Sequence, residues 1–95
     1  MLNQENKERC RKIIGHYGYR PQLGMVIEEC SELIKAACKM LRNGTCATEF
    51  SEDFKEELAD VVARCEQARQ MANVSESEIN MRVEKKLEKV IRKFS

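Results

Sequence analysis

The chain lacks the residue patterns that build zinc sites, disulfide frameworks or membrane spans. It contains one proline, four glycines, no tryptophan and a single histidine, His16. Its five cysteines form no Cys-x-x-Cys pair, which excludes the common zinc-binding patterns and favours reduced, buried thiols in a cytoplasmic protein. No apolar run approaches the roughly 20 residues of a transmembrane helix. The first residues also lack the apolar segment of a signal peptide.

Neither sign of charge dominates the sequence. Charged residues make up 35% of the 95 residues, yet the net charge is +1. A nucleic-acid-binding surface needs a clear basic excess, so we expect no nucleic-acid partner. With 42% hydrophobic residues the chain is too apolar to be disordered, and its length predicts a single domain over residues 1–95.

Helical spacing of apolar residues is the main structural signal. The segments that we expect to be helical are residues 3–16, 21–42, about 51–72 and 76–94. Ser75 and Glu78 form a capping box ahead of the last segment. Four amphipathic helices with short connections predict an all-α protein with the architecture of a four-helix antiparallel bundle.

Turn residues mark the connections between these segments. Glycines and a proline predict a turn over residues 15–20. Asn43-Gly44 is a helix stop signal ahead of an expected loop at residues 44–48. Either Thr48 or Ser51 is expected to cap the third helix.

The predicted helix at residues 21–42 has an unusually wide apolar arc. Three neighbouring helices would not cover it, so we expect a second subunit to bury the rest. Three carboxylates lie in this helix. Glu28 faces the polar side, whereas Glu29 and Glu32 point toward packed surface. Carboxylates are almost never buried unless they are paired or bind a metal, so Glu29 and Glu32 need a partner.

The third predicted helix repeats this pattern. Glu57 lies inside its apolar arc, and Asp60 lies on the margin of that arc three residues later. If the two helices are neighbours, four carboxylates converge, and they cannot all stay ionised without a cation. A site made only of oxygen ligands suits Mg²⁺ or Mn²⁺. A di-iron bundle would need Glu-x-x-His motifs, which the sequence lacks.

Basic and amide side chains accompany these carboxylates. Lys39 follows the acidic positions of the second predicted helix, and Lys86 and Lys93 lie on one margin of the last one. Phosphoryl-transfer chemistry combines metal ions with cations of this kind. Gln22 and Asn80 are further candidates for contacts with a substrate.

The two acidic motifs resemble the EExxE…ExxD signature of MazG-like nucleotide pyrophosphohydrolases, which belong to the all-α NTP pyrophosphatase superfamily. The first motif is Glu28-Glu29-Cys30-Ser31-Glu32, and the second is Glu57-Leu58-Ala59-Asp60. The flanking residues agree, with Gln22-Leu23 ahead of the first motif and Val61-Val62 after the second. The resemblance covers roughly residues 15–94, which is nearly the whole chain.

The resemblance implies a helical dimer, or dimer of dimers, that depends on Mg²⁺. Such enzymes cleave a nucleoside triphosphate between its α and β phosphates and release the monophosphate and pyrophosphate. By motif position the expected metal ligands are Glu29, Glu32, Glu57 and Asp60. Glu29 or Glu32 is the expected general base, and Glu28 is a further candidate for that role.

The last helix matches the family pattern only in part. Many relatives place an Asn between two basic residues there. Here Val90 stands between Lys86 and Lys93, and Asn80 is the candidate replacement for the amide.

Two alternative functions are compatible with the sequence. One is an enzyme of the same superfamily that acts on dUTP, dCTP or phosphoribosyl-ATP, because the candidate base contacts are few and scattered. The other is a non-catalytic helical interaction module whose acidic pairs bind a structural cation. An enzyme needs metal and nucleotide to bind together, whereas a module would bind Mg²⁺ without any gain in nucleotide affinity.

Overall fold

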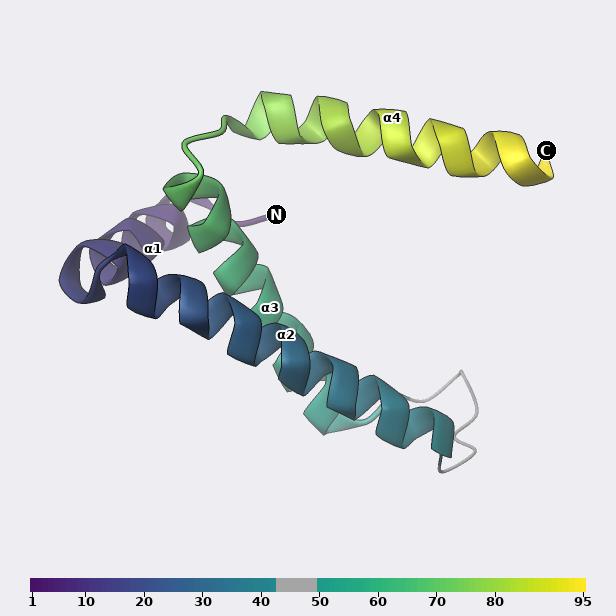
Figure 1. The fold of residues 1–95 in the computed structure, drawn as a ribbon, viewed down its shortest axis with the longest axis horizontal. Coiled ribbons are helices and arrows are strands. Elements are labelled where there is room, and N and C mark those ends of the chain that lie inside the picture. Colours follow the sequence, from purple (N-terminus) through teal and green to yellow (C-terminus); the bar gives the residue numbers. More distant parts are fainter. Residues whose placement is uncertain (43–49) are drawn as a thin grey trace.

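Four α-helices and no strand make up the described part of the chain, residues 1–42 and 50–95 of the computed structural model. They are α1 (Gln4–Tyr17), α2 (Tyr19–Arg42), α3 (Glu52–Met71) and α4 (Glu76–Phe94), shown in Figure 1. The prediction of an all-α protein with four helices is therefore confirmed. The expected helix stop at Asn43-Gly44, the loop at residues 44–48 and the alternative cap at Thr48 lie outside the described residues. None of the four helices combines the length and the hydropathy that a membrane span needs.

Side chains that cap the helix N-termini explain where α1, α3 and α4 begin. Asn3, Ser51 and Ser75 each accept a hydrogen bond from the backbone N–H three residues later, at 2.8, 3.1 and 3.1 Å. Each bond satisfies an N–H that has no partner within the helix, and such a cap is worth about 1 kcal/mol. Ser51, one of the two predicted caps, therefore marks the start of α3, and the predicted capping serine of α4 is confirmed.

The link between α1 and α2 is shorter than the predicted turn over residues 15–20, and that prediction is wrong. Helix α1 continues through Gly15, and Gly18 alone separates the two helices. Gly18 has φ 92° and ψ 166°, a conformation that a side chain would strain, so glycine is needed here. Pro21 does not interrupt α2, because the N–H groups of the first helical turn have no partner within the helix anyway.

The three-helix unit of α1, α2 and α3 has an unusually polar interior. Helices α2 and α3 run antiparallel side by side, and α1 packs against both (Figure 1). Among the described residues the buried side chains are Cys10, Gln22 and Gln67, with 5%, 4% and 1% of their surface exposed. Two of these three are glutamines, so hydrogen bonds as well as apolar burial hold the centre of the unit together.

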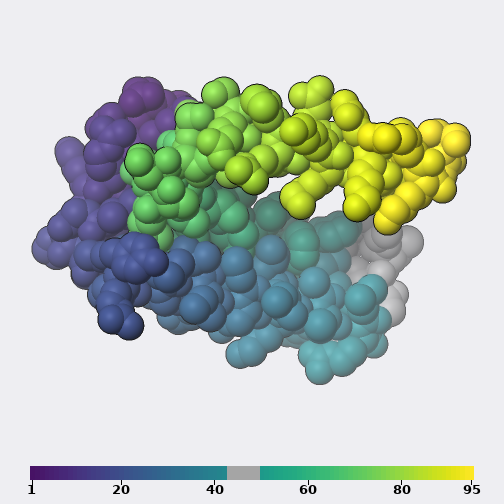
Figure 2. Space-filling view, turned by 45° about the horizontal axis from the view of Figure 1, so that its top comes forward, coloured from purple at the N-terminus to yellow at the C-terminus, as the bar shows by residue number. Residues whose placement is uncertain are grey.

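Helix α4 leads away from the three-helix unit and contains no buried residue. Figure 2 shows a hollow between its far half and α2. Its apolar stripe is 46–73% exposed and consists of Val83, Leu87, Val90, Ile91 and Phe94. The radius of gyration, 15.8 Å, exceeds the value of about 12 Å that a compact chain of this length would have. The apolar stripe of α4 is therefore left uncovered by α1, α2 and α3.

The end of α3 sets the chain on its path toward α4. Asn73 has φ 55°, and its N–H donates to the carbonyl oxygen of Gln70 at 3.0 Å, while the N–H of Val74 donates to that of Arg69 at 3.3 Å. This pair of bonds is the Schellman arrangement that commonly ends helices. The Arg69 side chain also donates to the Val74 carbonyl at 2.8 Å. The turn is therefore stabilised by both backbone and side-chain hydrogen bonds.

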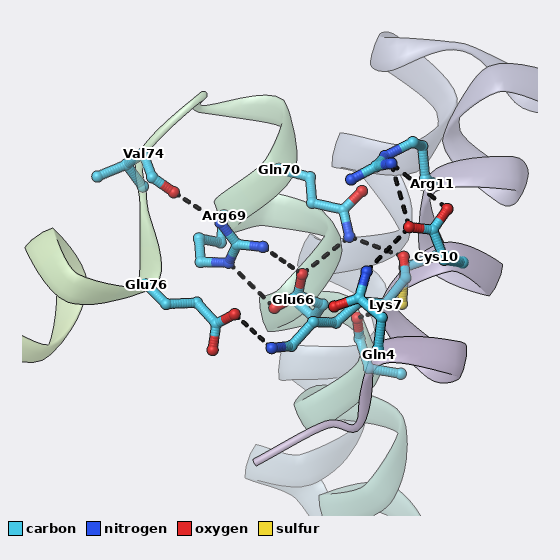
Figure 3. A network of polar contacts seen from close by, with 11 residues as sticks. Gln4, Lys7, Cys10, Arg11, Glu66, Arg69, Gln70, Val74 and Glu76 are labelled. Carbon is cyan, nitrogen blue, oxygen red and sulfur yellow. Dashed lines mark hydrogen bonds and ion pairs between the residues drawn. The ribbon is translucent and has the colours of Figure 1, made fainter.

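A polar network ties the start of α4 to α1 and α3 (Figure 3). Lys7 of α1 forms an ion pair with Glu76, the first residue of α4. Arg69 donates to the two carboxylate oxygens of Glu66, at 3.1 and 2.6 Å, and Gln70 donates to the same carboxylate at 2.8 Å. The Glu66 side chain is only 9% exposed, so this ion pair is shielded from water. These contacts at the first residues of α4 set the direction in which the helix leaves the three-helix unit.

Replacing Glu66 with glutamine should destabilise the protein most at neutral pH. The hydrogen bond from Arg69 holds the pKa of the Glu66 carboxyl below its ordinary value. A carboxylate with a lowered pKa stabilises the fold above about pH 4.3, the ordinary pKa, and this stabilisation is lost as the pH falls through the lowered pKa. We expect Glu66→Gln to cost about 1–3 kcal/mol at neutral pH and less in acid.

Urea unfolding at neutral and at acidic pH measures the free energy of unfolding of Glu66→Gln and of wild type under each condition. The matched control is Glu52→Gln on the same helix, whose carboxylate is 84% exposed and whose loss should be nearly neutral. If the difference in free energy of unfolding between Glu66→Gln and wild type stayed constant with pH, the ionised Glu66 carboxylate would not be the stabilising group.

Candidate metal centre

Polar side chains run in a stripe along α3 and face a similar stripe on α2. Within each helix the residues are spaced three, four or seven apart, which places them on one face. Their contact is the polar seam, which consists of Gln22, Glu29, Glu32 and Lys39 from α2 and Asp53, Glu57, Asp60, Arg64 and Gln67 from α3. The seam has a glutamine–arginine contact at one end, carboxylates in the middle and a groove lined by lysines at the other end.

Three carboxylates meet in the middle of the polar seam. Glu29 from α2 and Glu57 and Asp60 from α3 place one oxygen each within 4.8 Å of one another. We name these three residues the acidic triad. Glu29 and Glu57 are half-buried and Asp60 is exposed. Oxygen Oε2 of Glu57 is buried and has no hydrogen-bond partner among the described residues, which is costly for a carboxylate unless a cation or a proton satisfies it.

The pKa values of two members of the triad reflect this crowding. Burial raises the pKa of Glu57, and the charges of Asp60 and Glu32 raise it further. Burial also raises the pKa of Glu29, the charge of Asp60 adds to this, and the charge of Arg64 opposes it. Both carboxyls are therefore harder to ionise than an isolated glutamate, and a bound cation would relieve that cost.

The donor set of the triad fits a hard divalent cation. Mg²⁺ and Mn²⁺ prefer oxygen ligands, and three carboxylates supply them without any nitrogen or sulfur. The triad oxygens all lie within 4.8 Å of one another, so modest side-chain movements would bring them around a single ion. The orphaned Oε2 atom of Glu57 is independent support for such an ion.

A groove of about 510 Å³ opens beside Glu57, between the second half of α2 and the start of α3. This volume lies within the range of small-molecule sites. Its charged lining combines cations and carboxylates, namely Lys35, Lys39, Arg42, Glu32, Asp53 and Glu57. The groove therefore offers cations for phosphate groups directly beside carboxylates that suit a metal ion.

Of the other predicted residues of α2, Glu32 and Lys39 line the groove and Glu28 does not. Glu32 lies beside the triad, lines the groove with Glu57, and forms an ion pair of 3.6 Å with Lys35. Glu28 is exposed, as the helical projection predicts, and lies outside the triad. Lys39 lines the groove together with Glu32 and Glu57. Four of the five motif carboxylates are thus in or next to the seam.

The structure places the remaining predicted substrate contacts away from the groove. Gln22 is buried, and its amide oxygen accepts a hydrogen bond from Arg64 at 3.1 Å. Asn80 lines an apolar pocket between α3 and the start of α4. Lys86 and Lys93 belong to α4, which leads away from α2 (Figure 1). A single chain therefore does not bring the residues of α4 to the acidic triad.

Sequence reasoning missed the roles of Gln67 and Arg64. The hydrogen bonds of the Arg64 guanidinium go to Gln22 on α2 and Gln67 on α3, at 3.1 and 2.9 Å. The signal was present in the spacing. Gln67 follows Arg64 by three residues and so extends the stripe that contains Glu57 and Asp60.

No family model matches the chain, and no curated protein or solved structure matches it either. Function is therefore inferred from the acidic triad, from the groove beside it and from the spacing of the two motifs. Each of these is a property of side chains on α2 and α3.

Proposed function

We propose that this chain is a Mg²⁺-dependent, MazG-like nucleoside triphosphate pyrophosphohydrolase, which cleaves between the α and β phosphates to give the monophosphate and pyrophosphate. The observation that carries the proposal is the acidic triad with its orphaned Glu57 oxygen. The triad residues occupy motif positions in two acidic segments on facing helices, and a groove with three cationic side chains adjoins them. Carboxylates for a metal beside cations for phosphates are the parts that this reaction needs.

In this proposal Glu29, Glu57 and Asp60 hold the ion, with Glu32 beside them as a further ligand. Bound Mg²⁺ supplies neutralisation of the phosphate oxygens and a lower pKa for a coordinated water. Lys39 and its neighbours in the groove bind the outer phosphates and favour departure of pyrophosphate. Glu29, Glu32 or Glu28 accepts the proton of the attacking water.

The proposed enzyme is a homodimer or homotetramer. Exposed apolar residues on α2 support this, since Ile27, Ile34 and Leu41 are 69%, 63% and 84% exposed. The exposed apolar stripe of α4 and the large radius of gyration support it as well. Monomeric proteins rarely expose apolar surface on this scale. Association would also allow Lys86 and Lys93 of one subunit to approach the groove of another.

The test is turnover of a nucleotide panel by the full chain with Mg²⁺ or Mn²⁺. The panel contains the canonical NTPs and dNTPs with dUTP, and phosphoribosyl-ATP, which covers the alternative substrates within the superfamily. We expect equimolar monophosphate and pyrophosphate from at least one substrate, no free phosphate, and no reaction with EDTA. Chromatography of the nucleotides and a pyrophosphate assay measure both products.

Folded protein that turns over none of these substrates would count against the enzyme. If that protein still bound Mg²⁺, with no gain in nucleotide affinity, the non-catalytic interaction module would be the better description. Release of phosphate instead of pyrophosphate would place the cleavage at a different bond. In each case circular dichroism establishes that the protein tested is helical.

A further inference from the structure

Arg64 bridges α2 and α3 at the end of the polar seam opposite the groove. Its Nη1 atom donates to Oε1 of Gln22 on α2 at 3.1 Å and to Oε1 of Gln67 on α3 at 2.9 Å. One guanidinium nitrogen therefore links the two helices that carry the acidic triad. We name these three side chains the arginine clamp.

The arginine clamp contains both of the buried polar side chains of the described residues. Gln22 and Gln67 are 4% and 1% exposed. A buried amide is costly unless its oxygen has a donor, and hydrogen bonds from a charged donor are the stronger ones. Arg64 supplies that donor to both glutamines. Removing the guanidinium would leave two buried acceptors unsatisfied, so this contact is strongly favoured.

The position of the clamp links it to the acidic triad. Gln22 lies seven residues before Glu29 on the same face of α2, and Arg64 lies one turn after Asp60 on α3. The clamp thus fixes how far α2 can slide along α3. One helical turn rises about 5.4 Å, which is more than the 4.8 Å that encloses the triad oxygens. A slip of a single turn would therefore separate Glu29 from Asp60 and Glu57.

We propose that Arg64 is a positioning residue, which, through Gln22 and Gln67, holds α2 and α3 in the register that brings the acidic triad together for a divalent cation. This inference rests on the cation site of the proposed function. It assigns Arg64 no contact with substrate and no step of the reaction. It gives the two buried glutamines a reason to occupy the centre of the three-helix unit.

A positioning role and a purely electrostatic role predict opposite results. If Arg64 acted only through its positive charge, removing that charge would strengthen the binding of a cation to the nearby triad. If Arg64 holds the register, removing it weakens binding, because the ligands no longer converge. The sign of the change in affinity therefore separates the two roles.

The experiment measures Mn²⁺ affinity of the full chain by electron paramagnetic resonance of free Mn²⁺, with no nucleotide present. We expect Arg64→Met to weaken binding by about 10- to 100-fold, the cost typical of losing a residue that orients metal ligands. The matched control is Arg92→Met on α4, which removes the same charge from an exposed position and should leave affinity unchanged. Unchanged or tighter binding by folded Arg64→Met would overturn the proposal.

A second variant keeps the test informative if Arg64→Met fails to fold. Gln67→Met retains the charge of Arg64 and removes one anchor of the clamp, and we expect it to weaken Mn²⁺ binding too. Full affinity in folded Gln67→Met would overturn the clamp. Wild-type protein that binds Mn²⁺ but hydrolyses no nucleotide would overturn the proposed activity alone, whereas wild-type protein that binds no Mn²⁺ would overturn both.

Discussion

Replacing Glu57 with glutamine is expected to stabilise the metal-free protein and to abolish its stabilisation by Mg²⁺. Within the described part of the chain, a buried oxygen of Glu57 has no hydrogen-bond partner, and its carboxylate lies among other carboxylates. Burial and the charge of Asp60 raise its pKa. A raised pKa means that the ionised form destabilises the fold as the pH rises above the ordinary value. Glutamine has nearly the same shape and no charge, so it removes that cost.

The same substitution removes a ligand of the proposed cation site. A cation at 100 times its Kd stabilises the wild-type fold by about 2.7 kcal/mol, which raises the melting temperature of a protein of this size by about 10 °C or more. Glu57→Gln should lose this shift. Losing a residue that only orients a metal ligand typically costs about 10- to 100-fold in activity. Because Glu57 is a proposed ligand itself, the variant's rate of pyrophosphate release should fall by at least about 100-fold. Thermal melts with EDTA and with Mg²⁺, and the pyrophosphate assay, measure the three effects.

Glu56→Gln is the matched control for this experiment. Glu56 is the neighbouring glutamate on α3, is exposed and lies outside the acidic triad. It should melt like wild type, respond to Mg²⁺ and retain activity. If Glu57→Gln kept both the Mg²⁺ shift and the activity, Glu57 would not be a ligand, and the acidic triad would not be the cation site.

Placing two glutamates on the apolar stripe of α4 should convert the protein to a monomer. Leu87 and Ile91 are 59% and 51% exposed on a helix without a buried residue, so Leu87→Glu with Ile91→Glu should disturb little packing within the chain. If a second subunit covers the stripe, the two charges would become buried without partners, which is strongly unfavourable. We expect light scattering after size exclusion to give a multiple of 11.0 kDa for wild type and 11.0 kDa for the double variant.

Lys85→Ala with Lys89→Ala is the control for the stripe. These residues lie on the opposite side of α4 from Leu87 and Ile91, and the two substitutions change the net charge by the same amount. The control should keep the wild-type mass. A wild-type protein that is monomeric at high concentration would contradict the proposed association directly, and the apolar faces of α2 and α4 would then need a different partner.

Local signals in the sequence were sufficient to predict the helices. Ser51 and Ser75 cap α3 and α4 as their positions indicate, because capping depends on a side chain and an N–H three residues away. The turn around Gly18 was predicted too long, since a glycine inside a helix and a glycine between helices look alike in sequence. The direction of α4 was not predictable either. An amphipathic helix shows that one face needs a cover, but not which surface supplies it.

Helix periodicity also predicted much of the candidate centre. Spacings of three and four residues place Glu57 and Asp60 on one face of α3, and the structure brings Glu29 against them. Periodicity could not show how α2 and α3 are aligned along their axes. That alignment decides that Glu32 lies beside the triad and that Gln22 meets Arg64. It depends on contacts between residues 42 positions apart in the sequence, as for Gln22 and Arg64.

The polar seam restricts which substitutions the interface between α2 and α3 can accept. An apolar helix interface tolerates exchange of one aliphatic side chain for another of similar volume. The interface between α2 and α3 depends instead on donors matched to acceptors, so a change at Gln22, Arg64 or Gln67 leaves a neighbour with the wrong chemistry. Accepted substitutions there would come in compensating pairs across the two helices. A library that varies these positions together should yield folded variants that single replacements miss.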